Sequence, residues 1–172
     1  MKRILSISLV LALALMVLFP MTAVWGAEDS VTCTVTGENV SVSVTDGEVA
    51  YGTLGVDDVK NTLSGGLDDL QTATNDGNVT ADFNIKCSDA IDGDSGTNWT
   101  LATTTGTDQF KHEFSTNATF PGTALTGGYQ TLATGITASG TETFDLQITM
   151  PSSITDYSEK SITVTIQAVT LD

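Results

Sequence analysis

Alternation of apolar and polar residues with a period of two is the feature that most restricts the fold of this chain. Val40, Val42 and Val44 are separated by hydroxyl side chains, and similar alternation runs through residues 31–35, 83–87, 144–150 and 162–168. Because successive side chains of a β-strand point to opposite faces, each run predicts a strand with one apolar and one polar face. Such strands are typical of antiparallel sheets that contact water on one side.

Shorter runs and turn-rich stretches fill most of the remaining sequence. Further strands are expected at residues 49–54, 70–75, 98–103, 109–114 and 129–134. The stretches TDGE, NDGN, DGDSG and TGG separate the runs, and their Gly, Asn and Asp residues favour turns. Only VDDVKNTL, residues 56–63, suggests a single helical turn. The expected fold is therefore all-β: an antiparallel β-sandwich, immunoglobulin-like or jelly-roll-like.

The first 26 residues predict a secretory signal peptide. Lys2 and Arg3 precede an apolar run over residues 4–19, and a stretch that ends in small residues follows. The apolar run is short for a membrane span, although an uncleaved N-terminal anchor is the alternative. We therefore expect a secreted protein, extracellular or held at the cell surface.

Cleavage is expected after Gly26, with cleavage after Ala23 or Ala27 as alternatives. The mature chain, residues 27–172, is then of a size that forms one ordinary domain. The C-terminal sequence carries no wall-sorting motif and no apolar tail with a basic flank. We expect no covalent anchor.

Charge excludes some classes of partner. The chain has 6 basic and 21 acidic residues, and removal of Lys2 and Arg3 with the signal peptide leaves four basic residues, a net charge of −17 and no arginine. Such a surface repels phosphate backbones and anionic lipid headgroups. It also lacks the bidentate guanidinium that binds carboxylate or phosphate ligands. Nucleic acid and anionic membrane are therefore not expected partners.

The chain has two cysteines, Cys33 and Cys87. Each lies in phase with the apolar residues of its predicted strand, so both are expected to point to the buried side. Outside the cytoplasm an even number of cysteines predicts a disulfide, here between facing sheets. Two buried free thiols are the alternative.

Residues suited to catalysis are scarce. His112, in QFKHEF, is the only histidine, and its charged neighbours suggest a strand at or near the surface. The sequence has no GxSxG or HExxH motif and no cluster of His and Cys. A structural role for His112 is expected, and no catalytic residue is assigned. A hydrolase is the alternative, with His112 as the first residue to test.

The stretch SDAIDGDSGTNWTL carries the candidate binding residues. Asp89, Asp92 and Asp94 lie close together beside glycines, and oxygen-rich flexible loops of this kind bind Ca²⁺. A plain polar turn is the alternative, and no other cofactor is expected. Trp99 and Leu101 share one face of a predicted strand. They either belong to the core or form an exposed platform that stacks on a sugar ring.

The run DFNIKCSDA followed by IDGDSGTNWTL resembles the first half of the WxL domain of bacterial cell-wall-associated surface proteins, with Trp99 and Leu101 as the Trp-x-Leu motif. The second motif of that family is absent, because Ile166 and Ala168 stand where Trp and Leu are expected. The chain is also similar in plan to small secreted β-sandwich surface and matrix-fibre subunits. Either resemblance implies an exported, non-catalytic protein, and WxL domains associate non-covalently with the cell wall.

The sequence therefore predicts a structural or adhesive cell-surface protein that is not an enzyme. Its expected partners are cell-wall glycan, other surface proteins or further copies of itself. Self-association by strand addition could use AEDSVTCTVT, residues 27–36, or SITVTIQAVT, residues 161–170. The alternative is that both segments complete their own sandwich. A carbohydrate- or calcium-binding module is the alternative function.

Overall fold

The computed structural model describes residues 29–94 and 96–170. The predicted signal peptide and its alternative cleavage positions lie outside these residues. The chain divides after Thr36 into two units, which are described separately; the domain boundary expected at residue 27 stays a prediction. Across the two described ranges, no helix has the length and apolar character needed to cross a membrane.

Residues 29–36 contain no strand. Val31 and Val35 are 89% and 96% exposed, and Cys33 is exposed as well. The strand predicted over residues 31–35 is therefore wrong for this structure. A strand needs a neighbour for its backbone hydrogen bonds, and none of the described strands pairs with this segment.

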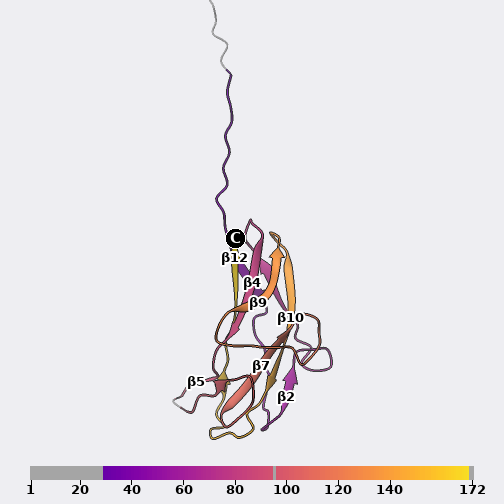
Figure 1. The fold of residues 1–172 in the computed structure, drawn as a ribbon, viewed down its shortest axis with the longest axis vertical. Coiled ribbons are helices and arrows are strands. Elements are labelled where there is room, and N and C mark those ends of the chain that lie inside the picture. The colour runs from indigo at the N-terminus through magenta and orange to yellow at the C-terminus, as the bar shows by residue number, and fades with distance from the viewer. Residues whose placement is uncertain (1–28, 95, 171–172) are drawn as a thin grey trace, which may run out of the picture. The chain divides into compact units, whose positions relative to one another are not determined.

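The larger sheet belongs to the second unit and is mainly antiparallel (Figure 1). Its strand order is β1 (Val42–Thr45), β3 (Gln71–Asn75), β10 (Thr141–Thr149), β7 (Gln109–Ser115) and β6 (Thr100–Leu101). Two short strands, β2 (Val59–Asn61) and β8 (Thr123–Ala124), pair with β10 and β7 respectively. Only the β6–β7 pair is parallel among these strands.

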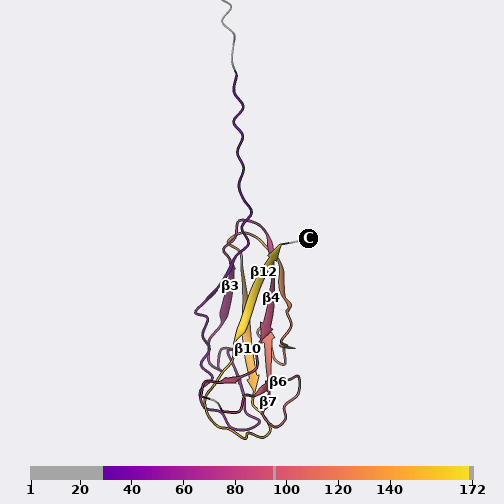
Figure 2. The same ribbon diagram turned by 90° about the vertical axis from the view of Figure 1, so that its left-hand side faces the viewer.

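The second sheet has the order β12 (Val164–Thr170), β4 (Ala81–Cys87) and β9 (Gln130–Ile136). Its register places Ile166 opposite Ile85, and the pairing of β4 with β9 is irregular around Phe83. A separate two-stranded ladder joins β5 (Ile91–Asp92) to β11 (Lys160–Ser161). Figure 2 shows β3 and β4 on different sides of this unit.

The two main sheets pack on each other through an apolar core. Phe83 and Ile85 of β4 are fully buried, and they pack with Phe114, Phe144 and Leu146 of the larger sheet. A second cluster lies around β6 and the adjoining parts of β7 and β10, and includes Trp99, Phe110, Ile148 and Met150. The structure is thus all-β and consistent with a β-sandwich, as the alternation predicts.

Most of the predicted strands are confirmed with small shifts of their ends: those at 40–45, 70–75, 83–87, 109–114, 129–134, 144–150 and 162–168. The run 98–103 forms only the two-residue β6. Residues 49–54 form no strand, and 56–63 contain β2 in place of a helical turn. Residues 49–54 have no partner strand among those described, so their alternation is not enough to make them a strand.

Strand β10 departs from the expected pattern of one wet face. Its residues 144–148 are all buried, including Asp145 and Gln147 on the polar face. Thr62 Oγ1 donates a hydrogen bond to Asp145 Oδ1 at 2.9 Å, and Gln147 Nε2 donates to Glu113 Oε2 at 3.1 Å. Polar partners from neighbouring segments therefore replace water on this face, which the sequence of β10 alone does not reveal.

Candidate binding groove

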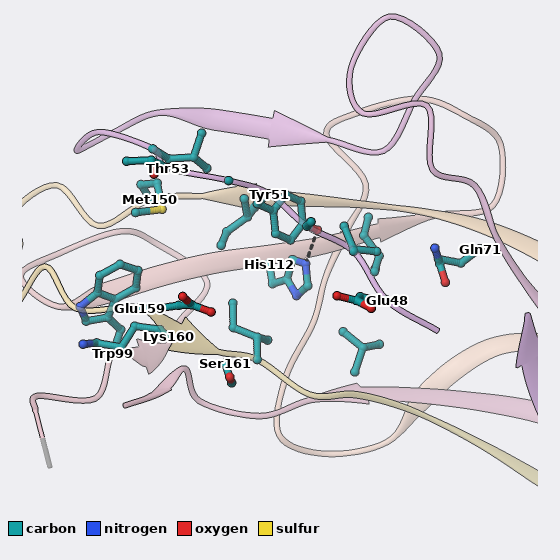
Figure 3. A pocket seen from close by; sticks show the side chains of 18 of the residues that line it. Glu48, Tyr51, Thr53, Gln71, Trp99, His112, Met150, Glu159, Lys160 and Ser161 are labelled. Carbon is teal, nitrogen blue, oxygen red and sulfur yellow. Dashed lines mark hydrogen bonds between the residues drawn. The ribbon is translucent and has the colours of Figure 1, made fainter. Parts of the chain in front are cut away.

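A groove of about 740 Å³ opens on one side of the sandwich (Figure 3). Three stretches line it: residues 47–54 after β1, residues 144–150 of and just after β10, and residues 157–166 through β11 into β12. Its apolar side chains include Phe144, Leu146 and Ile148. Figure 3 shows Glu48 and Glu159 among the labelled side chains, so acidic groups accompany the apolar lining.

The groove lies beside strand edges that are not closed by hydrogen bonds. β1 and β12 end their respective sheets, and in the described part of the chain β12 pairs only with β4. The intervening segment 47–54 contains Gly47 and Gly52 with φ of 69° and 75°. These left-handed conformations favour glycine and interrupt an extended strand. Segment 47–54 thus borders the groove without adding a strand to either sheet.

His112 lies at the groove but is only 2% exposed. The expectation of a histidine at or near the surface is wrong, because Phe110 and Phe114 share its inward face on β7. His112 Nε2 lies 2.8 Å from Tyr51 Oη, and Nδ1 lies 3.3 Å from Cys87 Sγ. Both ring nitrogens are therefore occupied by protein groups (Figure 3 shows the first contact).

One proton arrangement satisfies this buried network. Cys87 Sγ–H donates to Ser88 O at 3.3 Å, which leaves the sulfur to accept from His112 Nδ1–H. Tyr51 Oη–H then donates to the unprotonated Nε2. The arrangement needs a neutral imidazole, a neutral thiol and a neutral phenol. The three side chains consequently act as one internal polar link across the core.

Burial keeps these three groups neutral. Desolvation lowers the pKa of His112 to about 4. Desolvation, together with the charge of Asp89, raises the pKa of the Cys87 thiol to about 12. Burial also raises the pKa of Tyr51 above its usual range. A buried thiol that stays protonated is a weak nucleophile near neutral pH.

An ion cluster lies at the end of the groove near β5 and β11. Lys160 Nζ is 2.7 Å from Asp92 Oδ2 and 3.0 Å from Asp156 Oδ2, and the side chains of Lys160 and Asp92 are each 2% exposed. Asp92 Oδ1 accepts from the backbone N–H groups of Asp94 and Gly96. Ser158 Oγ lies within hydrogen-bond distance of both carboxylates, and its single O–H donates to one of them at a time. Every buried charge in the cluster thus has an opposite charge beside it.

These contacts set the charge state of the cluster. The hydrogen bond from Lys160, followed by those from Ser158 and the backbone, holds the pKa of Asp92 well below its usual range. Hydrogen bonds from Ser158 and Lys160 lower the pKa of Asp156 in the same way. Desolvation opposes the charge of Lys160, but its bonds to the two carboxylates raise its pKa overall. The cluster is therefore fully ionised near neutral pH.

The three aspartates predicted to bind Ca²⁺ have different hydrogen-bond partners in this structure. Asp89 Oδ1 accepts from Leu101 N at 2.7 Å, whereas Asp92 faces Lys160. Asp94 contributes its backbone N–H to Asp92. Among residues 29–94 and 96–170, no group of three or more His, Cys, Asp or Glu side chains is arranged to hold a metal ion. Asp92 thus has the Lys160 ammonium as its counter-charge, at 2.7 Å.

Trp99 lies in the core and also lines the groove. Its side chain is 7% exposed and packs with Phe110, Ile148 and Met150. Lys160 Nζ lies 5.6 Å from the centre of its ring. Among buried side-chain polar atoms in the described part of the chain, only Trp99 Nε1 lacks a hydrogen-bond partner. Leu101 is partly buried and packs against both apolar clusters.

The two cysteines are free in this structure. Cys33 is exposed and Cys87 is buried, so no disulfide is present, and the prediction that Cys33 points to the buried side of a strand is wrong. The physical reason is that residues 31–35 form no strand and so have no inward face. Cys87 lies on the inner face of β4, as predicted, and its sulfur contacts His112.

Sequence reasoning missed Tyr51, Lys160 and Asp156. Tyr51 lies in a segment that alternates like a strand but forms none. Nothing in the sequence therefore indicates that its side chain points toward the core. Lys160 meets Asp92 through register, because the two stand directly opposite each other in the β5–β11 pair, and Asp156 joins them by its ion pair with Lys160. Because the chain has few lysines and many acidic residues, the one available indication was that a lysine would find a carboxylate nearby, as Lys111 and Lys160 do.

Comparison with known proteins adds no identity to this geometry: no protein-family model, no curated protein and no solved structure matches the chain.

Proposed function

We propose that this protein is a secreted, non-catalytic structural or adhesive component of the cell surface, which associates non-covalently with the envelope or with copies of itself. The observation that carries the proposal is the internal use of its reactive side chains. His112, Cys87 and Tyr51 satisfy one another, and Lys160 is neutralised by Asp92 and Asp156. A protein built in this way offers partners a surface, with few groups poised for bond-making chemistry.

The finer fold assignment forms part of the proposal. From β3 onward, and leaving out the two-residue strands, β3, β4, β7, β9, β10 and β12 alternate between the two main sheets, whereas β1, β2 and β3 follow one another within the larger sheet. Immunoglobulin domains keep some consecutive strands in one sheet, as in the A–B and F–G pairs. The alternation from β3 to β12 supports a jelly-roll-like arrangement, and the placement of β1 beside β3 in one sheet is shared with immunoglobulin-like domains. The partial resemblance to WxL domains stays a prediction.

Cell fractionation tests the proposed function. Antiserum against the purified protein should detect it in the envelope fraction or the medium of the source cells, and mass spectrometry should show that residues 1–26 are absent. The protein should wash from the envelope in denaturant without any enzyme, because the attachment is non-covalent. Recovery of the full 172-residue chain in the cytoplasmic fraction would contradict the proposal.

A carbohydrate-binding module is the second candidate, because Trp99 Nε1 is a buried donor without a partner at the groove. A sugar hydroxyl could accept that hydrogen bond. Calorimetric titration with cell-wall glycan fragments tests this, with Trp99→Phe as the variant that keeps an aromatic ring but lacks the indole N–H. Equal heats for the wild type and the variant would assign Trp99 to the core alone. Repeating the titration in EDTA would show whether binding of the glycan needs Ca²⁺ between the protein and the sugar.

A further inference from the structure

The free edge of β12 presents a row of backbone groups. Ser88 N donates to Thr163 O, which directs the backbone of odd-numbered residues of β12 toward β4. In an antiparallel ladder the direction alternates, so Val164, Ile166 and Ala168 direct their N–H and C=O groups to the open side. β12 pairs only with β4 among the described strands. An open edge of this length is a template for an additional strand.

The side chains of the same residues favour an added strand that carries apolar side chains. Val164, Ile166 and Ala168 are partly buried and pack against the main core, and Val164 and Ile166 also line the groove. The floor of the groove is the apolar face of β10. A strand added to β12 would therefore place every second side chain over Phe144, Leu146 and Ile148. Apolar side chains at those positions would gain burial.

Residues 30–36, SVTCTVT, have the matching pattern. Val31, Cys33 and Val35 alternate with hydroxyl residues, and both valines are almost fully exposed. The segment is uncharged and rich in β-branched residues, which favour strands. Its seven residues equal the length of β12 and span about 23 Å when extended. Its composition thus favours a β-strand, although the segment has no partner strand among those described.

We propose that residues 30–36 of one copy of this chain add as a strand to the free edge of β12 in a second copy, with Val31, Cys33 and Val35 covering the groove. This inference rests on the proposed surface function and names one partner, the protein itself. The incoming backbone also carries carbonyl groups, one of which could accept from Trp99 Nε1. Repetition of the same contact would join copies head to tail.

Residues 37–39 mark where the second unit begins. Asn78 Nδ2 donates to Gly37 O at 2.8 Å, and the backbone of Asn39 exchanges hydrogen bonds with Asn78. These contacts fix residues 37–39 beside the turn between β3 and β4. In the register of β12 with β4, that is the end where Thr170 meets Ala81. Hydrogen exchange in a dilute monomer distinguishes contact with another copy from contact within one chain.

Charge sets the conditions for the contact. Each mature copy carries a net charge of −17, so copies repel one another at low ionic strength. The added segment is uncharged, and its contact with β12 is made by backbone groups and apolar side chains. Screening by salt should therefore promote assembly.

Light scattering on the secreted protein after size-exclusion chromatography tests the inference. We expect oligomers whose mass rises with protein concentration and with salt. The double substitution Val31→Asp with Val35→Asp should weaken association by more than about tenfold, because it places carboxylates over the apolar floor. The matched control, Thr32→Asp with Thr34→Asp, adds the same charge on the opposite face and should still assemble. A monomer at every salt and protein concentration, or equal effects of the two variants, would overturn the inference.

Hydrogen exchange locates the contact. In the assembled protein the amides of Val164, Ile166 and Ala168 should be protected, and in the Val31→Asp, Val35→Asp variant they should exchange fast while Thr165 and Gln167 stay protected. Adding the peptide SVTSTVT, which carries Ser for Cys33, to that variant should restore protection. Protection of the even-numbered amides in a dilute monomer would show the segment on its own chain and refute the exchange between copies. If the copies do not associate but the protein is found at the envelope, only this inference is refuted. If the protein is found in the cytoplasm, the proposed function itself is refuted.

Discussion

Lys160 stands directly opposite Asp92 in the β5–β11 ladder, and its Nζ lies 2.7 Å from Asp92 Oδ2 in surroundings that leave each side chain 2% exposed. Asp156 holds the same ammonium from the other side, at 3.0 Å. This pairing sets the surroundings of Asp92: a carboxylate that the sequence suggests as a calcium ligand has the ammonium of Lys160 beside it.

Replacing Lys160 by Met should destabilise the protein more than the matched change Lys60→Met. Removal of the ammonium leaves Asp92 and Asp156 close together without a counter-charge, whereas no ion pair involves Lys60 in the described part of the chain. Urea denaturation of both variants measures the difference in the free energy of unfolding. In addition, Ca²⁺ should raise the melting temperature of the Lys160→Met variant more than that of the wild type. Equal stability of the two variants would show that the cluster contributes little.

Formation of the same ion cluster should require glycine at position 96. A Cβ at Gly96 would come within van der Waals overlap of the carboxylates of Asp156 and Asp92, whereas a Cβ at Gly93 would meet nothing within 4 Å. Gly96→Ala should therefore lower the midpoint of thermal unfolding, and Gly93→Ala should leave it nearly unchanged. Differential scanning calorimetry of the two variants makes the comparison. A larger loss for Gly93→Ala would contradict the placement of this loop.

Stability should fall in mild acid because of His112. Its pKa is about 4 in the folded protein and near 6.5 in the unfolded chain, so the unfolded state binds the proton first as the pH falls. The contribution is complete above about pH 6.5 and is lost between about pH 6.5 and 4, by roughly 3 kcal/mol. His112→Gln should flatten this part of the pH profile of unfolding free energy measured in urea. Parallel profiles for the wild type and the variant would rule out His112 as the cause.

The two thiols should differ sharply in reactivity. At pH 8 without reductant, iodoacetamide should modify exposed Cys33 within minutes, while Cys87, with a pKa of about 12, reacts only after unfolding. Intact-mass spectrometry counts the added groups, and Cys33→Ser should give no modification of the native protein. Absence of any modification until a reductant is added would show that the disulfide expected from sequence forms in the purified protein.

Strands that the sequence predicts well are those whose alternation is long and ends in turn residues. The runs at 83–87 and 144–150 became β4 and β10, and Phe83, Ile85, Phe144 and Leu146 lie in the core. Residues 31–35 and 49–54 have the same local pattern but form no strand. Local alternation sets which way side chains would point, whereas a strand exists only where a neighbour supplies hydrogen bonds.

The residues of the candidate groove could be predicted only in part from the sequence. Trp99 and Asp92 were selected from sequence, and both lie at the groove or its ion cluster, but their partners were not foreseen. Tyr51 and Lys160 come from segments 48 and 61 residues from Trp99 along the chain, and nothing in their neighbouring residues marks them. The contact of His112 with Cys87 depends on two strands in different sheets.

The order of the residues by itself determined that this protein is all-β, strongly acidic and poor in catalytic side chains, because pattern, charge and composition are local or additive properties. Only the tertiary structure decided which polar groups neutralise one another and which strand edge is left open. These depend on register and on strand order, where a shift of a single residue turns each side chain to the other face.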